Sequence, residues 1–327
     1  MRILKGGSLS KTGVIDEKYV RKEVDLHTDI EYGYNRWYSQ LKRLQRYNEM
    51  FPDLFIPVLD FGVGDSYYDN KQCAYYTMPY MADSMNGYEY LDSVNTKEEA
   101  TLFFNKLQAS IKPMYDSFKL KSNSGGFDLY KNSDIDRPLL MANKNTTFSN
   151  FIKYDSINFI GEDIPSFHKN INIFYKLMSK NYVNPTECFT HGNLTLENIL
   201  YEPQKEKIWL IDPYDETTID SDLAEYSQLL QSSNSLYEYY NNKDCKIVEN
   251  NIIMENINIP NGIRWFNDEL TKFINTNYSK EEVISIKILE ISQFIRMIPF
   301  KIEKDLNKAI FFYGVASNLL NNLINEK

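Results

Sequence analysis

The chain has 327 residues, of which 43% are hydrophobic and 25% are charged, as in an ordinary globular protein. This length is more than one small core needs, so we expect two lobes. The formal net charge is −9 and the sequence contains no run of Lys or Arg, which argues against a nucleic-acid partner.

Cysteine and histidine usage gives no sign of a metal cluster. Cys73, Cys188 and Cys245 lack metal-ligand spacing, and the histidines lie far apart in the sequence. A sparse, odd number of cysteines is typical of a reducing compartment. No stretch is apolar for long enough to span a bilayer, and the start lacks the apolar run of a signal peptide. We therefore expect a soluble, cytoplasmic protein with no membrane span.

The N-terminal sequence predicts a strand, a glycine-marked turn and two further strands. Gly6, Gly7 and Ser8 form the turn. Glycine lets a backbone approach a phosphate and exposes N–H groups to it, so this turn either covers a phosphate or is a plain hairpin turn. In the third strand Arg21 and Lys22 are neighbours, so they point to opposite faces of the sheet.

Residues 31–50 predict an amphipathic helix, because aromatic and leucine side chains recur at steps of three and four. Residues 58–62 and 73–78 predict two more strands joined by a polar loop. Helices dominate from residue 84 onward, and the Asn-rich stretch 240–261 is expected to be a loop or a short surface excursion. The helices are expected within residues 97–120, 151–182, 220–240, 263–274 and 281–323.

The most informative segment is Thr-His-Gly-Asn-Leu-Thr-Leu-Glu-Asn-Ile-Leu at residues 190–200, followed by Ile-Trp-Leu-Ile-Asp-Pro at residues 208–213. It brings His191 and Asn198 into one loop and delivers Asp212 at the end of a short hydrophobic strand. A lone His-Gly or Ile-Asp pair is common by chance. Several polar positions with two strand-like flanks in one order are not, so the segment indicates a functional site.

The segment resembles the catalytic loop of the aminoglycoside phosphotransferase and choline kinase-like family, which has the pattern H-G-D-L-x-x-x-N-[IV]-[LI] and then a strand ending in I-D. The variant Thr195-Leu196-Glu197 looks most like the branch associated with bacterial surface-polysaccharide gene clusters. The resemblance implies an α+β, two-lobed protein-kinase-like fold. A small antiparallel-sheet N-lobe would cover residues 1–80, and a larger, mainly helical C-lobe residues 81–327. The matching positions are His191, Gly192, Leu194, Asn198, Ile199, Leu200, Ile211 and Asp212.

The resemblance also implies that ATP and Mg²⁺ are the cofactors. Asn198 and Asp212 would hold Mg²⁺ against the nucleotide phosphates, and His191 would brace the backbone of the catalytic loop. Lys22 resembles the strand lysine that pairs with the α- and β-phosphates, and Arg21 is the alternative cation.

Two further features of the family have counterparts here. Met78 and Tyr80, at the end of the last predicted N-terminal strand, resemble the interlobe hinge whose backbone binds adenine, and the glycine-marked turn would cover the phosphates. The family's helix Glu, which pairs with the strand Lys, aligns with Tyr34, and Glu31 is the acidic residue nearest the helix start. Glu31 either takes this part or only favours the positive helix N-terminus.

One position departs from the family pattern, because Asn193 occupies the place of the Asp that accepts the proton of the substrate hydroxyl. A carboxamide does not take a proton at neutral pH. Three explanations for Asn193 remain open. It is natural and the protein is a nucleotide-binding pseudoenzyme, or it is natural and another carboxylate serves as the base, or it is an introduced substitution for Asp. Candidates for another base are the carboxylates of Glu197, Asp215, Asp220 and Asp222, and Asp215 is also the candidate second metal ligand.

The function expected from the sequence is ATP- and Mg²⁺-dependent transfer of phosphate to a hydroxyl of a small polar molecule. A sugar or amino alcohol of surface-polysaccharide metabolism fits that description. The alternative is a catalytically weak or inactive nucleotide-binding pseudokinase or scaffold protein, which Asn193 favours. Transfer of another group of ATP, such as a nucleotidyl group, is a third possibility.

Overall fold

The computed structural model describes residues 2–4, 10–26, 31–69, 71–121, 126–181, 186–214 and 219–326. The chain forms two compact units, each assembled from separate segments. The first consists of Met1–Tyr90, Asn105–Met114 and His191–Thr217, and the second of Leu91–Phe104, Tyr115–Thr190 and Thr218–Lys327. The loop that carries His191 and Asp212 therefore folds together with the N-terminal segment.

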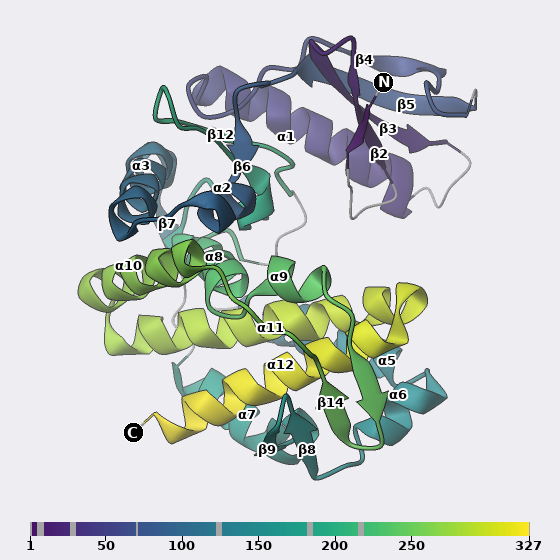
Figure 1. Cartoon of the computed structure of the whole chain (residues 1–327), viewed down its shortest axis with the longest axis vertical. Coiled ribbons are helices and arrows are strands. Elements are labelled where there is room, and N and C mark those ends of the chain that lie inside the picture. The colour runs from purple at the N-terminus through teal and green to yellow at the C-terminus, as the bar shows by residue number, and fades with distance from the viewer. Residues whose placement is uncertain are drawn as a thin grey trace. The chain divides into compact units, whose positions relative to one another are not determined.

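The first unit contains an antiparallel sheet of five strands (Figure 1), so the α+β class and the antiparallel N-terminal sheet expected from the sequence are confirmed. Strand β3 lies in the middle, between β2 and β5, and β4 forms one edge. In order across the sheet the strands are β1 (Arg2–Leu4), β2 (Lys11–Ile15), β3 (Tyr19–Asp25), β5 (Gln72–Pro79) and β4 (Asp60–Asp65).

One helix packs on this sheet. A π-helical turn, η1 (Glu31–Asn35), leads into α1 (Arg36–Met50), which Figure 1 shows lying along the sheet. Its buried side chains include Trp37, Leu41 and Leu44, the apolar stripe that the three- and four-residue spacing predicts. The Trp37 ring lies 6.3 Å from the ring of Tyr76 on β5.

A second, three-stranded sheet holds the loop region of the first unit. Strand β11 (Ile199–Glu202) pairs on one side with β12 (Lys207–Leu210) and on the other with the short β6 (Met85–Asn86). The Leu210 N–H donates to the Leu54 carbonyl oxygen at 2.8 Å, which ties the end of β12 to the segment that follows α1. The two strands therefore hold the end of the loop at Ile199 opposite Leu210, two residues before Asp212.

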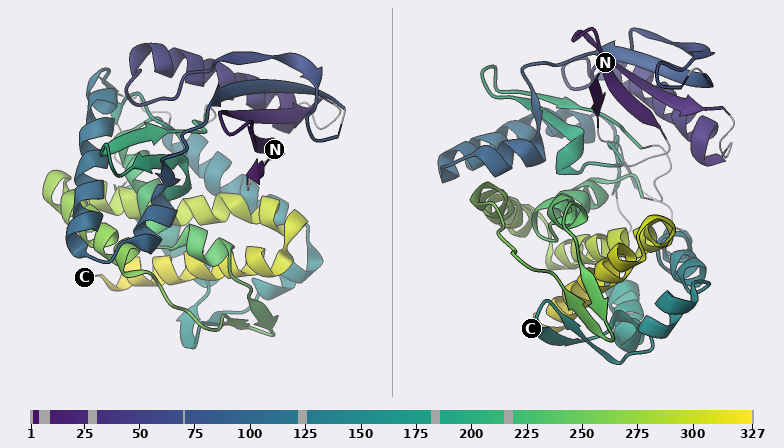
Figure 2. Two further views of the ribbon diagram at one scale, coloured as in Figure 1. Left: turned by 45° about the horizontal axis from the view of Figure 1, so that its top comes forward. Right: turned by 45° about the vertical axis from the view of Figure 1, so that its right-hand side comes forward.

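The second unit is mainly helical. Helix α11 (Lys280–Lys304) begins with a capping box formed by Ser279 and Glu282, and it lies beside α12 (Leu306–Asn325) in both views of Figure 2. The single helical region expected over residues 281–323 is thus two helices. They are separated at Asp305, whose side chain caps α12 by accepting a hydrogen bond from the Lys308 N–H at 3.0 Å.

The other helices differ in length, and none of the helices described is long and apolar enough to cross a membrane. The longer ones are α3 (Lys97–Asp116), α7 (Phe167–Asn181), α8 (Asp222–Ser233) and α10 (Asn261–Asn277). The shorter ones are α2 (Gly87–Ser93), α4 (Gly126–Lys131), η2 (Asn132–Asp136), α5 (Arg137–Ala142), α6 (Thr146–Phe151), α9 (Tyr237–Asn241) and η3 (Leu196–Asn198).

The Asn-rich stretch 240–261, expected to be a loop or a short surface excursion, contains regular structure. It contains a hairpin of β13 (Lys246–Val248) and β14 (Asn251–Ile253), and β14 pairs in parallel with β8 (Ser156–Phe159). The sheet is completed by β9 (Glu162–Pro165), and a separate pair joins β7 (Leu120–Lys121) to β10 (Thr186–Glu187). The hairpin is held by burial, because the fully buried Ile252 packs against Gly314 of α12.

Candidate functional site

His191 is the buried brace of the loop. It is fully buried, its ring stacks on Phe55 at 6.1 Å, and its Nε2 donates to the Ile211 carbonyl oxygen at 2.7 Å. Burial lowers the pKa of His191 to about 4, so the imidazole is neutral at pH 7. The His191 carbonyl oxygen also accepts from the Tyr214 N–H at 2.8 Å. His191 thus binds the backbone both before and after Asp212, at Ile211 and Tyr214. Its low pKa does not suit a proton donor.

Asn198 is oriented by the loop itself. Its Nδ2 donates to the Asn193 carbonyl oxygen at 2.8 Å and to Thr195 Oγ1 at 3.2 Å. Its backbone oxygen accepts from the Ile211 N–H at 3.0 Å, which brings it next to the residue before Asp212. The amide nitrogen is used by the loop, while Oδ1 accepts no hydrogen bond from the residues that the structure describes. Within the described part of the chain, Asn198 Oδ1 is therefore available to bind a ligand.

Asp212 lies in a turn with a φ of 55°, in the left-handed region that few residues other than glycine adopt. The short polar side chain of Asp is among those that tolerate this conformation. Asp212 Oδ1 accepts a hydrogen bond from Lys22 Nζ at 2.8 Å, and 37% of the Asp212 side chain is exposed. Because unusual backbone geometry persists only where the surroundings hold it, the contacts of His191 explain why the turn is kept.

The two neighbouring cations of β3 have different surroundings. The ammonium of Lys22 lies between Asp212 and Gln40 and is buried. On the other face of the sheet the Arg21 guanidinium lies 3.6 Å from the centre of the Tyr75 ring, and its Nε donates to Glu23 Oε1 at 2.7 Å. Of the two candidates it is Lys22 that the structure brings to Asp212.

Gln40 of α1 is a site residue that the sequence reasoning missed. Its Oε1 accepts from Lys22 Nζ at 2.9 Å and from the Tyr76 hydroxyl at 3.2 Å, and its Nε2 donates to the Pro213 carbonyl oxygen at 3.2 Å. A signal was present in the sequence, because Gln40 is a polar residue three positions after Trp37 and next to Leu41, on the apolar stripe of the helix.

The sequence aligned the family's helix Glu with Tyr34 and named Glu31 as the nearby acidic candidate for pairing with Lys22. Tyr34 packs its ring on Trp37, with ring centroids 5.6 Å apart, and on Tyr38 at 6.2 Å. The side chain of Glu31 lies outside the part of the chain that the structure describes. Among the described residues, the helix residue that contacts Lys22 is Gln40 of α1.

The end of β5 has one backbone donor already in use. The Tyr80 N–H donates to the Lys18 carbonyl oxygen at 2.7 Å, on the β3 side of the strand. In a planar trans peptide the C=O and the N–H point in opposite directions, so the Pro79 carbonyl points away from the side of β3. Strand β4 does not cover that side, because its first residue, Asp60, pairs with Thr77. Met78 is buried.

Of the remaining candidates, Asp220, Asp222 and Glu197 are among the described residues. Gly6, Gly7, Ser8 and Asp215 are outside the described residues. Asp220 and Asp222 belong to the second unit, where each accepts a hydrogen bond from a hydroxyl: Asp220 from Thr190 at 2.6 Å and Asp222 from Tyr278 at 2.7 Å. Burial raises the pKa of Asp222. Glu197 is exposed.

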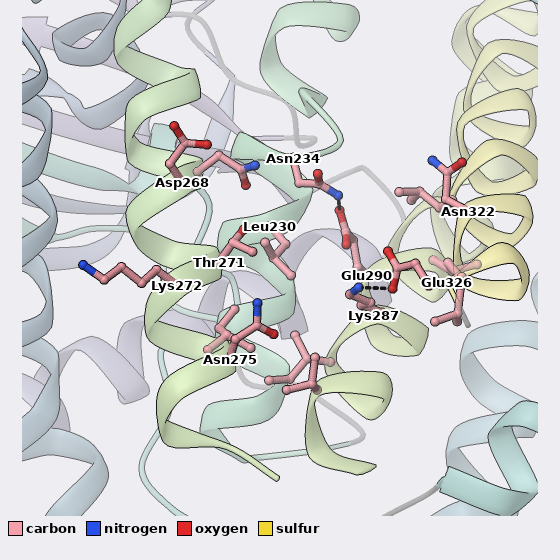
Figure 3. A pocket seen from close by; sticks show the side chains of 17 residues that line it. Leu230, Asn234, Asp268, Thr271, Lys272, Asn275, Lys287, Glu290, Asn322 and Glu326 are labelled. Carbon is pink, nitrogen blue, oxygen red and sulfur yellow. Dashed lines mark hydrogen bonds and ion pairs between the residues drawn. The ribbon is translucent and has the colours of Figure 1, made fainter. Parts of the chain in front are cut away.

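The second unit contains a pocket of about 500 Å³ between helices α8, α10, α11 and α12 (Figure 3). At its centre the buried carboxylate of Glu290 accepts from Asn234 Nδ2 at 2.9 Å and from the Ser235 hydroxyl. Lys287 and Glu326 form an ion pair at the same pocket. Burial raises the pKa of Glu290 to about 7. These hydrogen bonds join the end of α8 to α11, so Glu290 has a structural part in the fold.

The side chains around Asp212 fit a single hard cation. No group of three or more His, Cys, Asp and Glu side chains able to hold a metal ion occurs among the described residues. A carboxylate and an amide oxygen remain, from Asp212 and Asn198. Mg²⁺ keeps several waters and takes only one or two protein oxygens beside substrate phosphates, so this pair suits it.

Comparison with known proteins shows the fold. No protein-family model and no curated protein matches the sequence. Among solved structures, the apo form of a thermostable mutant of aminoglycoside phosphotransferase APH(4)-Ia aligns over 98% of this chain and 93% of that one, with TM-score 0.58 and 9% identity. The GDP complex of aminoglycoside 2'-phosphotransferase-IIIa aligns over 98% and 92%, with TM-score 0.55 and 10% identity.

A glucosamine kinase in complex with glucosamine, ADP and inorganic phosphate aligns over 98% of this chain and 75% of that one, with TM-score 0.54 and 7% identity. At identities this low, the structural similarity shows a shared fold alone. The kinase-like fold that the loop motif predicted is therefore confirmed.

Proposed function

We propose that this protein transfers phosphate from a nucleotide to a hydroxyl of a small polar molecule. The observation that carries the proposal is the contact of Lys22 with Asp212 at 2.8 Å, together with an Asn198 whose amide oxygen accepts no hydrogen bond from the described residues. A strand cation, a loop amide and a carboxylate at the end of the next strand are the parts that phosphoryl transfer requires. Two solved structures of similar fold contain a nucleotide together with a small polar molecule. They are an aminoglycoside phosphotransferase APH(4)-Ia with AMP-PNP and hygromycin B, and a glucosamine kinase with glucosamine and ADP.

In this proposal Asp212 and Asn198 hold Mg²⁺. When bound, the ion neutralises negative charge on the nucleotide phosphates. The protein contributes orientation, because Asn198 Nδ2 is fixed by the Asn193 carbonyl and the Asp212 turn is fixed by His191. Lys22 has three N–H donors, of which the described residues Asp212 and Gln40 use two, so within the described part of the chain one remains for a phosphate oxygen.

The nucleotide base would bind at the end of β5. Because the Tyr80 N–H is engaged by Lys18, we assign the hinge contacts to the Pro79 carbonyl and the Met81 N–H. Met78 would pack against the base from the strand. The turn at Gly6, Gly7 and Ser8 remains a proposed phosphate cover. ATP is the proposed nucleotide.

The acceptor hydroxyl would approach Asn193, whose side chain makes no hydrogen bond with the residues that the structure describes. An amide gives no general-base assistance, which is worth about 10²–10⁴-fold, whereas positioning and charge neutralisation remain. We therefore expect a slow enzyme, with a sugar or amino alcohol of surface-polysaccharide metabolism as the acceptor. The described cysteines are free, which supports a reducing, cytoplasmic setting.

The second candidate is a nucleotide-binding pseudokinase or scaffold, and Asn193 is the observation that favours it. Both candidates require the nucleotide site, and they differ only in whether phosphate is transferred.

The test of the shared site is metal-dependent stabilisation by ATP. A ligand that binds only the folded state stabilises it by about 2.7 kcal/mol at a hundredfold excess over Kd. We expect this gain with ATP and Mg²⁺ together, little without Mg²⁺, and loss of most of it in Asp212→Ala. Asp53→Ala, which removes an exposed carboxylate of the same unit, is the control. If titration calorimetry at millimolar ATP detects no binding by the wild-type protein, both candidates are wrong.

A further inference from the structure

Gln40 joins three elements of the first unit through one side chain. Its oxygen accepts from Lys22 of β3 at 2.9 Å and from Tyr76 of β5 at 3.2 Å. Its nitrogen donates to the carbonyl oxygen of Pro213, the residue after Asp212, at 3.2 Å. The orientation of the amide follows from its partners, because an ammonium can only donate and a carbonyl can only accept.

The position is chemically suited to an amide and not to the acid that resemblance to kinases leads one to expect. A carboxylate offers acceptors at both oxygens. One of them would meet the Lys22 ammonium favourably, but the other would face the Pro213 carbonyl oxygen at hydrogen-bond distance. That contact would replace a hydrogen bond by repulsion between two acceptors. Gln40 satisfies both neighbours at once.

Gln40 carries no charge, so it does not neutralise the Lys22 ammonium that it contacts. Among the described residues Asp212 is the one carboxylate that pairs with this ammonium. If Asp212 turns to a metal ion, Gln40 still holds Lys22 in place without cancelling its charge. The full positive charge is then available to a phosphate, which is stabilised most strongly by charged donors in a buried site.

We propose that Gln40 is a positioning residue of the phosphate site, which holds Lys22 through a neutral acceptor and the Asp212 turn through a donor. This proposal rests on the proposed nucleotide site. It predicts that the amide at position 40 matters for the phosphates of a nucleotide and not for its base. The contacts of Gln40 run to Lys22, to Pro213 and to Tyr76 within β5, and none of those described runs to Pro79 or beyond it.

The experiment compares ATP with adenosine, which lacks the phosphates. Affinities are measured by titration calorimetry in Mg²⁺ for the wild type, Gln40→Leu and Gln40→Glu. For Gln40→Leu we expect ATP affinity to fall about fivefold, the effect of losing one ordinary hydrogen bond, and adenosine affinity to stay unchanged. Gln40→Glu should lose at least as much ATP affinity, although it adds an ion pair with Lys22.

The matched control is Gln45→Glu, which makes the same chemical change on α1 at a position without a described contact to the site. A Gln40→Glu protein that binds ATP as well as or better than the wild type would overturn the proposal, since it would show that the site prefers a carboxylate. Equal losses for ATP and adenosine would also overturn it, because a general disturbance of the fold affects both ligands. A wild-type protein that binds neither ligand would instead refute the proposed function itself.

Discussion

The functions of the two neighbouring cations of β3 can be separated at the level of single residues. Lys22 contacts Asp212 and Gln40, whereas Arg21 pairs with the buried Glu23 on the other face of the sheet. Lys22→Met should weaken ATP binding by roughly 1.5–3 kcal/mol, the worth of a hydrogen bond to a charged group.

Arg21→Met should act on stability. It leaves the Glu23 carboxylate buried without its cation, which costs on the order of 3 kcal/mol. Urea unfolding and calorimetry on both variants measure the two effects. A loss of ATP affinity in a folded Arg21→Met protein, with none in Lys22→Met, would reverse the assignment.

The same scale shows what a sequence can reveal. The loop from His191 to Asn198 was predictable because its residues are contiguous. Strand alternation placed Arg21 and Lys22 on opposite faces of the sheet, so only one of the two could face the site. Gln40 was not found, because the expected residue was an acid and an amide carries no signal of its own. Its place on the apolar stripe of α1 was the only cue.

At the level of elements, the junction of α8 and α11 should give the protein a pH-dependent stability. Burial raises the pKa of Glu290 to about 7, from an ordinary value of 4.5. Between these values the folded state keeps the proton and the unfolded chain loses it. Stability therefore falls as the pH rises from 4.5 to 7, and the penalty is complete above the folded pKa.

Glu290→Gln should remove this dependence and be more stable than the wild type at pH 8, because the amide still accepts from Asn234 and Ser235 and carries no charge. Urea unfolding between pH 5 and pH 8 measures the difference. Glu303→Gln, an exposed position of the same helix, is the control. Parallel pH profiles for the wild type and Glu290→Gln would contradict this account of the junction.

Some helices and strands could be predicted from the sequence and others could not. The helix over residues 31–50 and the strands around β3 and β5 follow from long periodic patterns. The hairpin of β13 and β14 did not, because strands of three residues carry too little alternation and Asn is depleted in strands. Burial of Ile252 against α12 decides that structure, and this is a contact between distant parts of the chain.

At the level of the whole chain, the first unit is not a continuous N-terminal stretch. It takes in His191–Thr217, which supplies Asn198 and Asp212 to the same unit as Lys22 and Gln40. Sequence patterns identify local elements, and they do not show that a loop far along the chain folds with the first sheet. The resemblance in the loop motif assigned the loop, within residues 81–327, to the C-lobe, and it linked the loop to Lys22 only through a shared nucleotide.

The central claim, that this site transfers phosphate, is tested most directly by single-turnover loss of the ATP γ-phosphate in the wild type and in Asn193→Asp. The panel of acceptors comprises sugars and amino alcohols, each with Mg²⁺. We expect slow transfer by the wild type and a gain of about 10²–10⁴-fold in Asn193→Asp, with nucleotide affinity little changed, because a carboxylate restores the general base. No transfer to any acceptor by either protein, while ATP is still bound, would contradict the claim and leave a nucleotide-binding pseudokinase.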